Sequence, residues 1–466
     1  MLDEEAVLNG ARNGNESFLV ANVLAMTAIP ALLLGGGSAL AGGLFLAFGV
    51  LAPLNVLAYS RGWADAPKHT FALYLLALSP LIAQLALTLA GSPVLAEDAN
   101  GNLTLAQTDA PIVSAAFPFS AAVFSDLANL AAAACGLSIL FITSSRYIIR
   151  KILFAGACMA AGLSVFGLLK IPLETIPQLP LPSLGEHSFS TFADAPQWAA
   201  FGMLWLGAAF ATALGSPQRF RLETFATSQR LAAVAVAAAI LLGILKAGTP
   251  VEKTLALALA GASFALLALD TLPTKRNAGR NAAARHLKSE YKRAHLAVPA
   301  ACYAAAAVAA FLFAAKTVSD AAADGAGGLF ETSIPAEIRA GILEDSRKLA
   351  ETAPATGWGS ASYKTLMAFS QGADLGGEPT ESPRSDLLQK LVENGKVGLI
   401  LAAIAPIFLF AGTLFGGGFS AASLALLLSA VAVAAAGVVD APFQSTAVSA
   451  SFWIIAAAAY KWERSK

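Results

Sequence analysis

Two arginines in the longest polar segment of the chain are the residues best suited to bind or transform a ligand. This segment, residues 333–398, lies in a chain that is otherwise mostly apolar, and it is too long to be a simple connection. Arg339 and Arg384 lie near its two ends. A guanidinium group matches the geometry of phosphate oxygens, so either arginine is suited to hold an anion. The alternative interpretation of each is a solvated side chain on a loop helix.

Local sequence signals predict how the first arginine is positioned. Ser333 and Pro335 are typical of a helix start, and the helix that follows carries Arg339. Pro354 marks the end of this helix. The sequence GWGS at residues 357–360 then predicts a tight turn, because glycine adopts backbone angles that other residues avoid.

The second arginine is predicted to lie at the start of another helix. Ser382 and Pro383 are typical of a helix start, which places Arg384 in the first turn. The helix dipole disfavours a cation at that position. A bound anion, held by Arg384 and by the free amides of the helix start, would remove this conflict.

The rest of the chain has the composition of a membrane protein. It has 466 residues, of which 57% are hydrophobic, and a mean hydropathy of +0.66. Apolar runs long enough to cross a bilayer predict an all-α, polytopic membrane protein with about twelve transmembrane helices. The predicted spans cover residues 17–35, 38–58, 70–91, 118–142, 151–171, 196–214, 230–247, 252–271, 297–315, 397–415, 418–437 and 442–460.

Basic residues predict the orientation of these spans. Positively charged short loops remain in the cytoplasm, and in a twelve-span arrangement the basic segments all lie on one side. Residues 1–315 then form the first nine spans, residues 316–396 form a large periplasmic loop with a small helical subdomain, and residues 397–466 form the last three spans and a short cytoplasmic tail. We expect this multi-pass protein in the inner membrane. The basic segments are residues 144–151, 217–230, 275–295 and 461–466.

Charge and cysteine usage argue against several classes of partner. The net charge is zero, so no nucleic-acid partner is predicted, and membrane lipids are the expected surroundings. Cys135, Cys158 and Cys302 lie in apolar runs and are interpreted as packing residues. The four histidines are scattered along the chain, and His187 is the one predicted to lie outside. We therefore expect no disulfide, metal or cofactor.

The polar segment resembles the external loop of the O-antigen ligase family, which includes O-antigen ligases, O-antigen polymerases and protein O-oligosaccharyltransferases. In that family a helix containing an arginine opens the loop, a P-x-x-G-x-G-x-x-[ST]-[FY] turn follows, and an H-N-x-x-L-Q-x-x-x-E-x-G-x-x-G helix closes it. Arg339 matches the opening helix. The turn and the closing helix are matched by Pro354, Gly357, Gly359, Ser362, Tyr363, Leu388, Gln389, Glu393, Gly395 and Gly398.

Two further segments are similar to this family. Residues 189–205 resemble its segment before the sixth span, and residues 437–453 resemble its late V-x-D-x-P segment. The chain departs from the pattern where the closing helix starts, because Arg384 replaces a histidine that is implicated in catalysis. The Ser-Arg pair usual before the eighth span is absent as well. The remaining departures, in the sixth-span and closing-helix motifs, fall on Asp194, Pro196, Gln197 and Ser385.

The resemblance implies a metal-independent transferase. Such enzymes move a glycan from a polyprenyl diphosphate to a hydroxyl of a lipid or glycan acceptor. The implied diphosphate ligands are Arg339 and Arg384, which we expect to converge over a cavity open to the external leaflet. Because arginine cannot accept a proton at neutral pH, a carboxylate or histidine must do so. The candidate bases are Asp386, Glu381, Asp194 and His187. The candidate substrate-binding residues are Trp358, Tyr363, Gln389, Asp194, Gln197 and His187.

Alternatives remain open at this stage. A family member that binds a lipid-linked glycan without transferring it fits the missing histidine. A secondary transporter usually carries ionisable residues deep in its spans, whereas those seen here lie near predicted span ends. Trp358 either packs at the membrane surface or stacks on a sugar, and Asp440 either caps a helix or orients an arginine of the loop.

The predicted orientation can be tested by cysteine labelling. In a background without the native cysteines, we expect Leu375→Cys to react with a membrane-impermeant reagent on intact cells and Glu290→Cys to remain unlabelled, because the basic segment is held inside. Labelling of Glu290→Cys but not of Leu375→Cys would contradict the predicted orientation.

Overall fold

The computed structural model describes the main helices of the chain and part of the polar segment. The described residues are 20–32 with gaps, 68–90, 92–97, 103–108, 121–141, 146–170, 188–192, 194–215, 225–271, 289–323, 336–359, 362–363, 366–367, 382–415 and 420–464.

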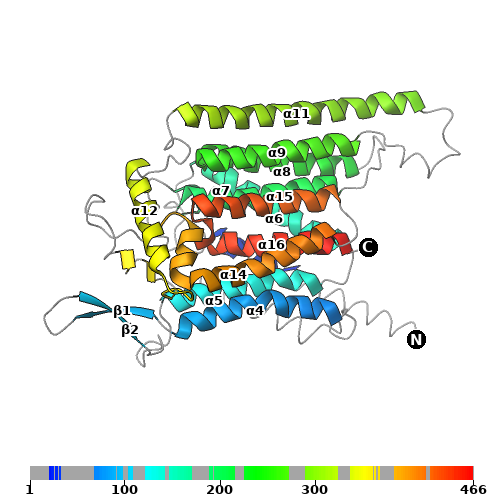
Figure 1. Cartoon of the computed structure of the whole chain (residues 1–466). Coiled ribbons are helices and arrows are strands. Elements are labelled where there is room, and N and C mark those ends of the chain that lie inside the picture. Colours follow the sequence, from blue (N-terminus) through cyan, green and yellow to red (C-terminus); the bar gives the residue numbers. More distant parts are fainter. Residues whose placement is uncertain are drawn as a thin grey trace, which may run out of the picture.

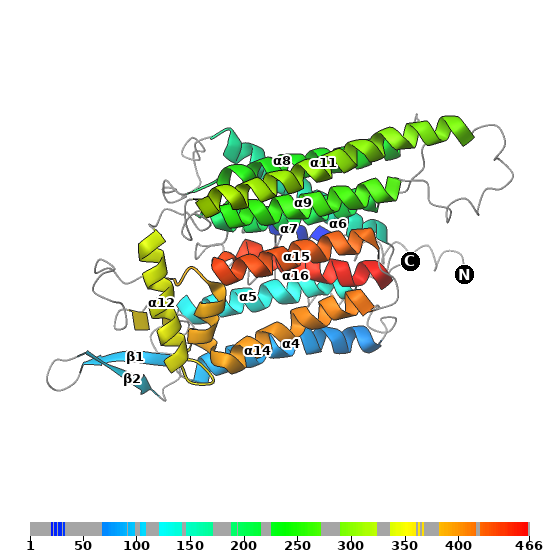
Figure 2. The ribbon, with the colours of Figure 1, turned by 45° about the horizontal axis from the view of Figure 1, so that its top comes forward.

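Long helices that run side by side form the body of the protein (Figure 1). A second view shows the same bundle with α12 lying across one end (Figure 2). The helices of the bundle are α4 (Lys68–Ala90), α5 (Ala121–Leu137), α6 (Arg146–Leu168), α7 (Ala195–Leu214), α8 (Phe225–Ala247), α9 (Pro250–Thr271), α11 (Ser289–Ala323), α14 (Asp386–Phe415), α15 (Ala421–Val439) and α16 (Thr446–Arg464).

Seven helices in the described part of the chain are long and apolar enough to cross a membrane, namely α6, α7, α8, α9, α11, α14 and α15. This finding bears out the coarse prediction of a polytopic helical protein. Helices α4, α5 and α16 lie where three more spans are predicted, and the predicted span 38–58 lies outside the described residues. The total of twelve spans stays a prediction.

Helix α7 is at the centre of the bundle. Its side chains are apolar on all sides and nearly all buried, and the indoles of Trp198 and Trp205 are fully enclosed. A helix that is apolar all round belongs inside a bundle. Small residues on its neighbours permit close packing: a Cβ added at Gly156 of α6 would lie 2.1 Å from the Trp205 ring.

The outer helices expose large apolar side chains. Leu312 and Phe313 of α11 are 66% and 62% exposed, and Ile400 and Ile407 of α14 are 63% and 62% exposed. Water-soluble proteins seldom leave such extended apolar faces uncovered. These faces are therefore suited to contact with lipid chains.

A β-hairpin that the sequence did not predict is attached to the helical bundle. Strands β1 (Ser92–Glu97) and β2 (Leu103–Thr108) pair antiparallel, with Ser92 opposite Thr108 and Glu97 opposite Leu103. The sequence LTLAQT of β2 begins with an alternation of apolar and polar residues, which favours a strand. This short signal lies between the predicted spans 70–91 and 118–142, where no strand was predicted.

The described parts of the polar segment form a small helical unit, here called the cap, which comprises residues 336–359, 362–363, 366–367 and 382–395. Its first helix, α12 (Ala336–Thr352), begins directly after Pro335 and ends before Pro354, as predicted. The cap has its own apolar core, separate from that of the bundle. This core consists of Ile342, Leu349, Tyr363, Leu366, Met367 and Val392.

The last helix of the cap begins later than predicted. Helix α14 starts at Asp386, and Ser385 caps it by accepting the Leu388 amide on its Oγ at 3.3 Å. Arg384 therefore precedes the helix and is not in its first turn. The predicted start was wrong because the Ser385 hydroxyl has a distant partner: it donates to the Val438 carbonyl at 2.7 Å.

The glycine turn of the cap is docked on a break in α14. The amides of Trp358 and Gly359 donate to the carbonyls of Val392 and Glu393 at 3.0 and 2.7 Å. These carbonyls accept from the turn because α14 is interrupted at Gly395, where φ is 64°. The two glycine motifs of the polar segment therefore bind each other through their backbones.

This docking predicts that two glycines cannot carry a side chain. A Cβ at Gly357 or at Gly395 would lie 2.3 Å from a carbonyl oxygen, and both residues have positive φ. We expect Gly357→Ala and Gly395→Ala to destabilise the protein by about 2 kcal/mol or more. Thermal unfolding of the purified protein in detergent is the measurement.

Gly162→Ala in α6 is the matched control, because a Cβ there would meet nothing within 4 Å. Alanine favours a helix over glycine, so this variant should unfold at an equal or higher temperature. The docking account is wrong if the three variants unfold at the same temperature as the native protein.

Candidate functional site

Three segments that are far apart in the sequence meet at the end of the bundle beneath α12. The start of α7 contributes Asp194, the start of α14 contributes Arg384 and Asp386, and the end of α15 contributes Asp440. Arg384 Nη1 donates to Asp194 Oδ2 at 2.7 Å, and the Asp386 amide donates to the Asp440 carbonyl at 3.1 Å. The sequence prediction that these residues form one site therefore agrees with their placement.

Arg384 is held in an unusual backbone conformation. Its φ is 51°, a region that non-glycine residues rarely occupy, and its amide donates to Ser382 Oγ at 3.2 Å. Such strain persists only where surrounding contacts impose it, and it is often found at functional sites. The Arg384 and Asp194 side chains are 29% and 26% exposed, so this ion pair lies at the boundary with the surroundings.

Arg339 lies deeper than Arg384. It is 5% exposed, and its guanidinium donates to the Val439 carbonyl at the end of α15. Burial lowers the pKa of Arg339, and the nearby charge of Asp440 opposes this effect. The charge of Arg384 also lowers the pKa of Arg339, and the convergence of the two side chains over a cavity stays a prediction. Only Arg384, however, presents substantial side-chain surface outside the protein.

The charges of both arginines act on the buried carboxylate of Asp440. It is 4% exposed, it ends α15, and its Oδ1 accepts the Ala441 amide at 2.8 Å. Burial raises the pKa of Asp440, and the charges of Arg339 and Arg384 oppose that rise. Both sequence interpretations of Asp440, as a helix end and as the partner of a loop arginine, agree with this position.

Glu252 is a member of the cluster that sequence reasoning missed. It lies in the first turn of α9, is 1% exposed, and its charge acts on Asp440 and Asp194. Its Oε2 accepts the amide and hydroxyl of Thr249 at 3.0 and 3.3 Å, which is a capping box. Its Oε1 is buried and has no hydrogen-bond partner. The motif TPVE is typical of a capping box and carries no sign of the distant charges.

Asp386 and Gln389 belong to the site but are engaged by protein groups. Asp386 Oδ2 accepts the Phe443 amide at 2.9 Å and so fixes the turn η7 (Pro442–Gln444). Gln389 donates to Glu393 Oε1 at 3.1 Å and accepts from Gln444 Nε2 at 2.8 Å. The carboxylate of Asp386 therefore orients the turn η7 in this structure, and its role as the base stays a prediction.

The remaining predicted residues have different positions. Tyr363 is 1% exposed in the cap core, its hydroxyl lies 2.6 Å from Ser346 Oγ, and burial raises its pKa to about 12. It is therefore a packing residue, and its predicted contact with substrate is not supported. Trp358 packs against the same core. Gln197 lies half-exposed in the first turn of α7. His187 and Glu381 lie outside the described residues.

Arg384 gives the cluster one partly exposed guanidinium that can hold an anion. Among the residues that the structure describes, no three His, Cys, Asp or Glu side chains are grouped to hold a metal ion. Arg384 forms an ion pair with Asp194, and the charges of Arg339 and Arg384 both act on Asp440. A phosphate-bearing ligand can compete with Asp194 for Arg384, because that pair is the exposed part of the cluster.

Comparison with known proteins adds no family assignment. No protein-family model matches the chain, and no curated protein matches it.

The ion pair between Arg384 and Asp194 can be measured by a double-mutant cycle. We expect a coupling energy of about 1 kcal/mol from Arg384→Ala, Asp194→Ala and the double variant, measured by thermal unfolding, because both side chains are less than one-third exposed. The control cycle uses Arg347 and Glu351 of α12, which are 75% and 65% exposed and should show coupling close to zero. Equal coupling in the two cycles would contradict a special role for the first pair.

Proposed function

We propose that this protein is a membrane-embedded glycan ligase or polymerase that resembles the O-antigen ligase family. It transfers a polyprenyl-diphosphate-linked glycan to a lipid or glycan acceptor at the external face of the inner membrane. The observation that carries this proposal is the ion pair between Arg384 and Asp194. It joins two residues 190 positions apart, one in residues 189–205 and one in residues 333–398, and each of these segments resembles that family on its own. The third such segment is attached through the bond of Ser385 to Val438.

The distribution of charge supports the proposed orientation. Arg146 begins α6, Arg230 lies near the start of α8 and Arg464 ends α16, and all three helix ends lie away from the cap. Their side is cytoplasmic by the rule for basic residues. The cap and the cluster then face the periplasm, where lipid-linked glycans are assembled in this proposal.

Arg384 is the proposed ligand of the diphosphate. Its guanidinium is partly exposed, its backbone is fixed, and its partner Asp194 can be replaced by phosphate oxygens. Arg339 is a positioning residue, since its buried guanidinium holds the end of α15 and adds positive charge beneath the site. Positive charge at this point stabilises the diphosphate as it leaves the glycan.

Asp194 is the proposed proton acceptor. When Arg384 turns to the diphosphate, the carboxylate of Asp194 is released beside the reacting sugar. The acceptor oxygen then forms a bond to the anomeric carbon, the bond from that carbon to the diphosphate breaks, and the acceptor proton moves to Asp194. The carboxylates of Asp386 and Glu252 are less suited, because they accept hydrogen bonds from the backbone amides of Phe443 and Thr249.

A second candidate function is binding of the lipid-linked glycan without transfer. The presence of arginine at the position of the family's catalytic histidine favours it, since arginine supplies charge but accepts no proton. Both functions require the same donor site at Arg384. They differ only in whether a glycosidic bond is formed.

Transfer by the purified protein tests the proposal. With a polyprenyl-diphosphate-linked oligosaccharide and a glycan acceptor, we expect Arg384→Ala to lose about 100-fold or more in rate and Arg384→Lys to recover part of it, because lysine lacks the two-pronged fork. Asp194→Asn should reduce transfer while donor binding persists. Arg347→Ala removes an exposed arginine of the same cap and should change neither.

Three results separate the candidates. Transfer that depends on Arg384 and Asp194 supports the ligase or polymerase. Donor binding that depends on Arg384 without any transfer supports the binding protein. The proposed site is contradicted if the native protein neither binds nor transfers the donor. It is also contradicted if Arg384→Ala binds and transfers the donor as the native protein does.

A further inference from the structure

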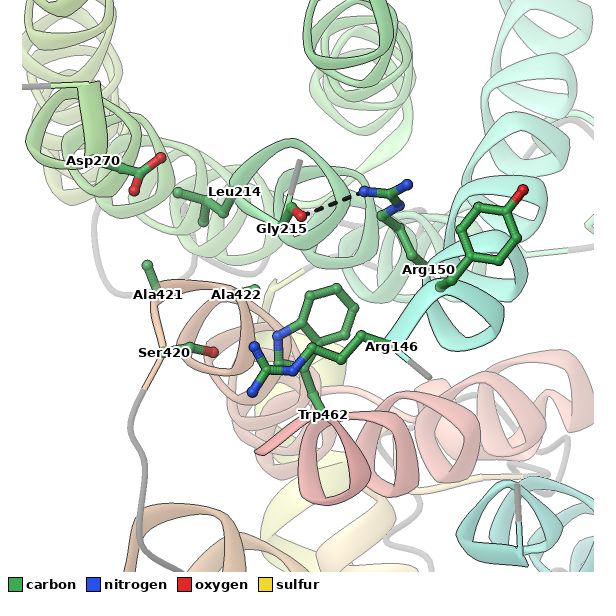
Figure 3. A pocket seen from close by; sticks show the side chains of 10 residues that line it. Arg146, Arg150, Leu214, Gly215, Asp270, Ser420, Ala421, Ala422 and Trp462 are labelled. Atoms are coloured by element: carbon green, nitrogen blue, oxygen red, sulfur yellow. Dashed lines mark hydrogen bonds between the residues drawn. The ribbon is translucent and has the colours of Figure 1, made fainter. Parts of the chain in front are cut away.

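A pocket of about 340 Å³ lies at the end of the bundle opposite the cap (Figure 3). The start of α6, the ends of α7, α9 and α16, and the start of α15 meet around it. Pockets of this size commonly hold small ligands. It is separate from the cluster around Arg384, because α7, α9 and α15 contribute their other ends to that cluster.

Positive charge dominates the wall of this pocket. Arg146 and Arg150 extend over it from α6 (Figure 3). Arg150 Nη1 donates to the Gly215 carbonyl at 3.4 Å, which fixes its direction. The acidic wall residue Asp270 is already neutralised by Arg230, whose Nη2 lies 2.5 Å from its Oδ2. The two arginines of α6 are therefore the basic side chains of the pocket wall, and the carboxylate of its one acidic wall residue is paired with Arg230.

Two helix starts add to this positive potential. Arg146 is the first residue of α6, and Ser420 caps the start of α15 at the same pocket. The positive end of a helix dipole disfavours a cation, so an arginine at the start of α6 beside the start of α15 is unfavourable in isolation. An anion in the pocket would convert this repulsion into attraction.

The aromatic residues of the wall suit a ligand that also has an apolar part. Tyr147 is 53% exposed, and Lys151 Nζ lies 4.4 Å from the centre of its ring. Trp462 is 3% exposed and closes the inner side. Tyrosine and tryptophan are typical of the level of lipid head groups, where one face is apolar and the other polar.

We propose that this pocket binds a phosphate group, carried by an anionic phospholipid of the adjacent leaflet or by a soluble phosphate. Basic pockets between membrane helices on the cytoplasmic side are suited to anionic head groups. The inference does not depend on the glycan-transfer proposal, because it uses other residues at the other end of the protein. Arg146 and Arg150 hold the phosphate, and Tyr147 and Trp462 contact the adjoining apolar atoms.

Binding to the purified full-length protein in a neutral detergent tests this proposal. The probes are phosphatidylglycerol, phosphatidylcholine as the uncharged reference, and inorganic phosphate, and the readout is the rise in unfolding temperature that a ligand of the native state produces. We expect phosphatidylglycerol to raise the unfolding temperature and phosphatidylcholine to leave it unchanged. Arg146→Gln with Arg150→Gln should weaken binding about 30-fold, on the basis of roughly 1 kcal/mol for each basic side chain.

Lys151→Gln is the matched control, because it removes the same charge from α6 without removing a wall residue. Its affinity for the probe should stay within about twofold of the native value. The loss of one wall arginine should instead weaken the affinity roughly fivefold. If the double variant does not fold, Arg146→Gln alone leaves the bond of Arg150 to Gly215 intact and should weaken binding about fivefold.

The results separate the two sources of phosphate. A response to phosphatidylglycerol alone identifies a lipid head group, and a response to inorganic phosphate identifies a soluble ligand. The proposal is overturned if neither probe raises the unfolding temperature, if Lys151→Gln weakens binding as much as the arginine variants, or if the arginine variants bind like the native protein.

Discussion

The burial of carboxylates at one end of an apolar helix bundle is the constraint on which the rest of the structure depends. Asp440 and Glu252 are almost fully buried, and the charge of Asp194 acts on both. An uncompensated buried carboxylate costs several kcal/mol, and the charges that oppose the raised pKa of Asp440 are those of Arg339 and Arg384. Arg339 and Arg384 come from the cap. The cap is therefore required by the electrostatics of the bundle and cannot be regarded as an independent loop.

Backbone geometry makes this dependence rigid. The glycine turn of the cap fits the break in α14 at Gly395, and Ser385 ties the start of α14 to the end of α15. Between these two attachments Arg384 has a strained, left-handed backbone and faces Asp194. With its backbone fixed in this way, Arg384 has only its side chain to turn from Asp194 to the diphosphate in the proposed reaction. In this account the same contacts that hold the cap also prepare the ligand site.

The sequence predicted which residues form the cluster better than it predicted the role of each residue. Arg339 and Arg384 were expected to converge, Asp194 and Asp386 were named as candidate bases, and the structure places all four at the same end of the bundle. The start of α14 and the hairpin of β1 and β2 were missed, because the first depends on a tertiary bond of Ser385 and the second on a short alternation in an otherwise unmarked segment. Glu252 was missed because its local signal is a helix cap, and its distant partners leave no trace in one sequence.

The central claim is that the diphosphate of a lipid-linked glycan replaces Asp194 as the partner of Arg384. The most direct test is an experimental structure of the purified protein with a polyprenyl diphosphate bound. The account predicts phosphate oxygens within hydrogen-bond distance of the Arg384 guanidinium and a longer separation between Arg384 and Asp194 than the present 2.7 Å. A bound diphosphate elsewhere, with the ion pair between Arg384 and Asp194 unchanged, would contradict it.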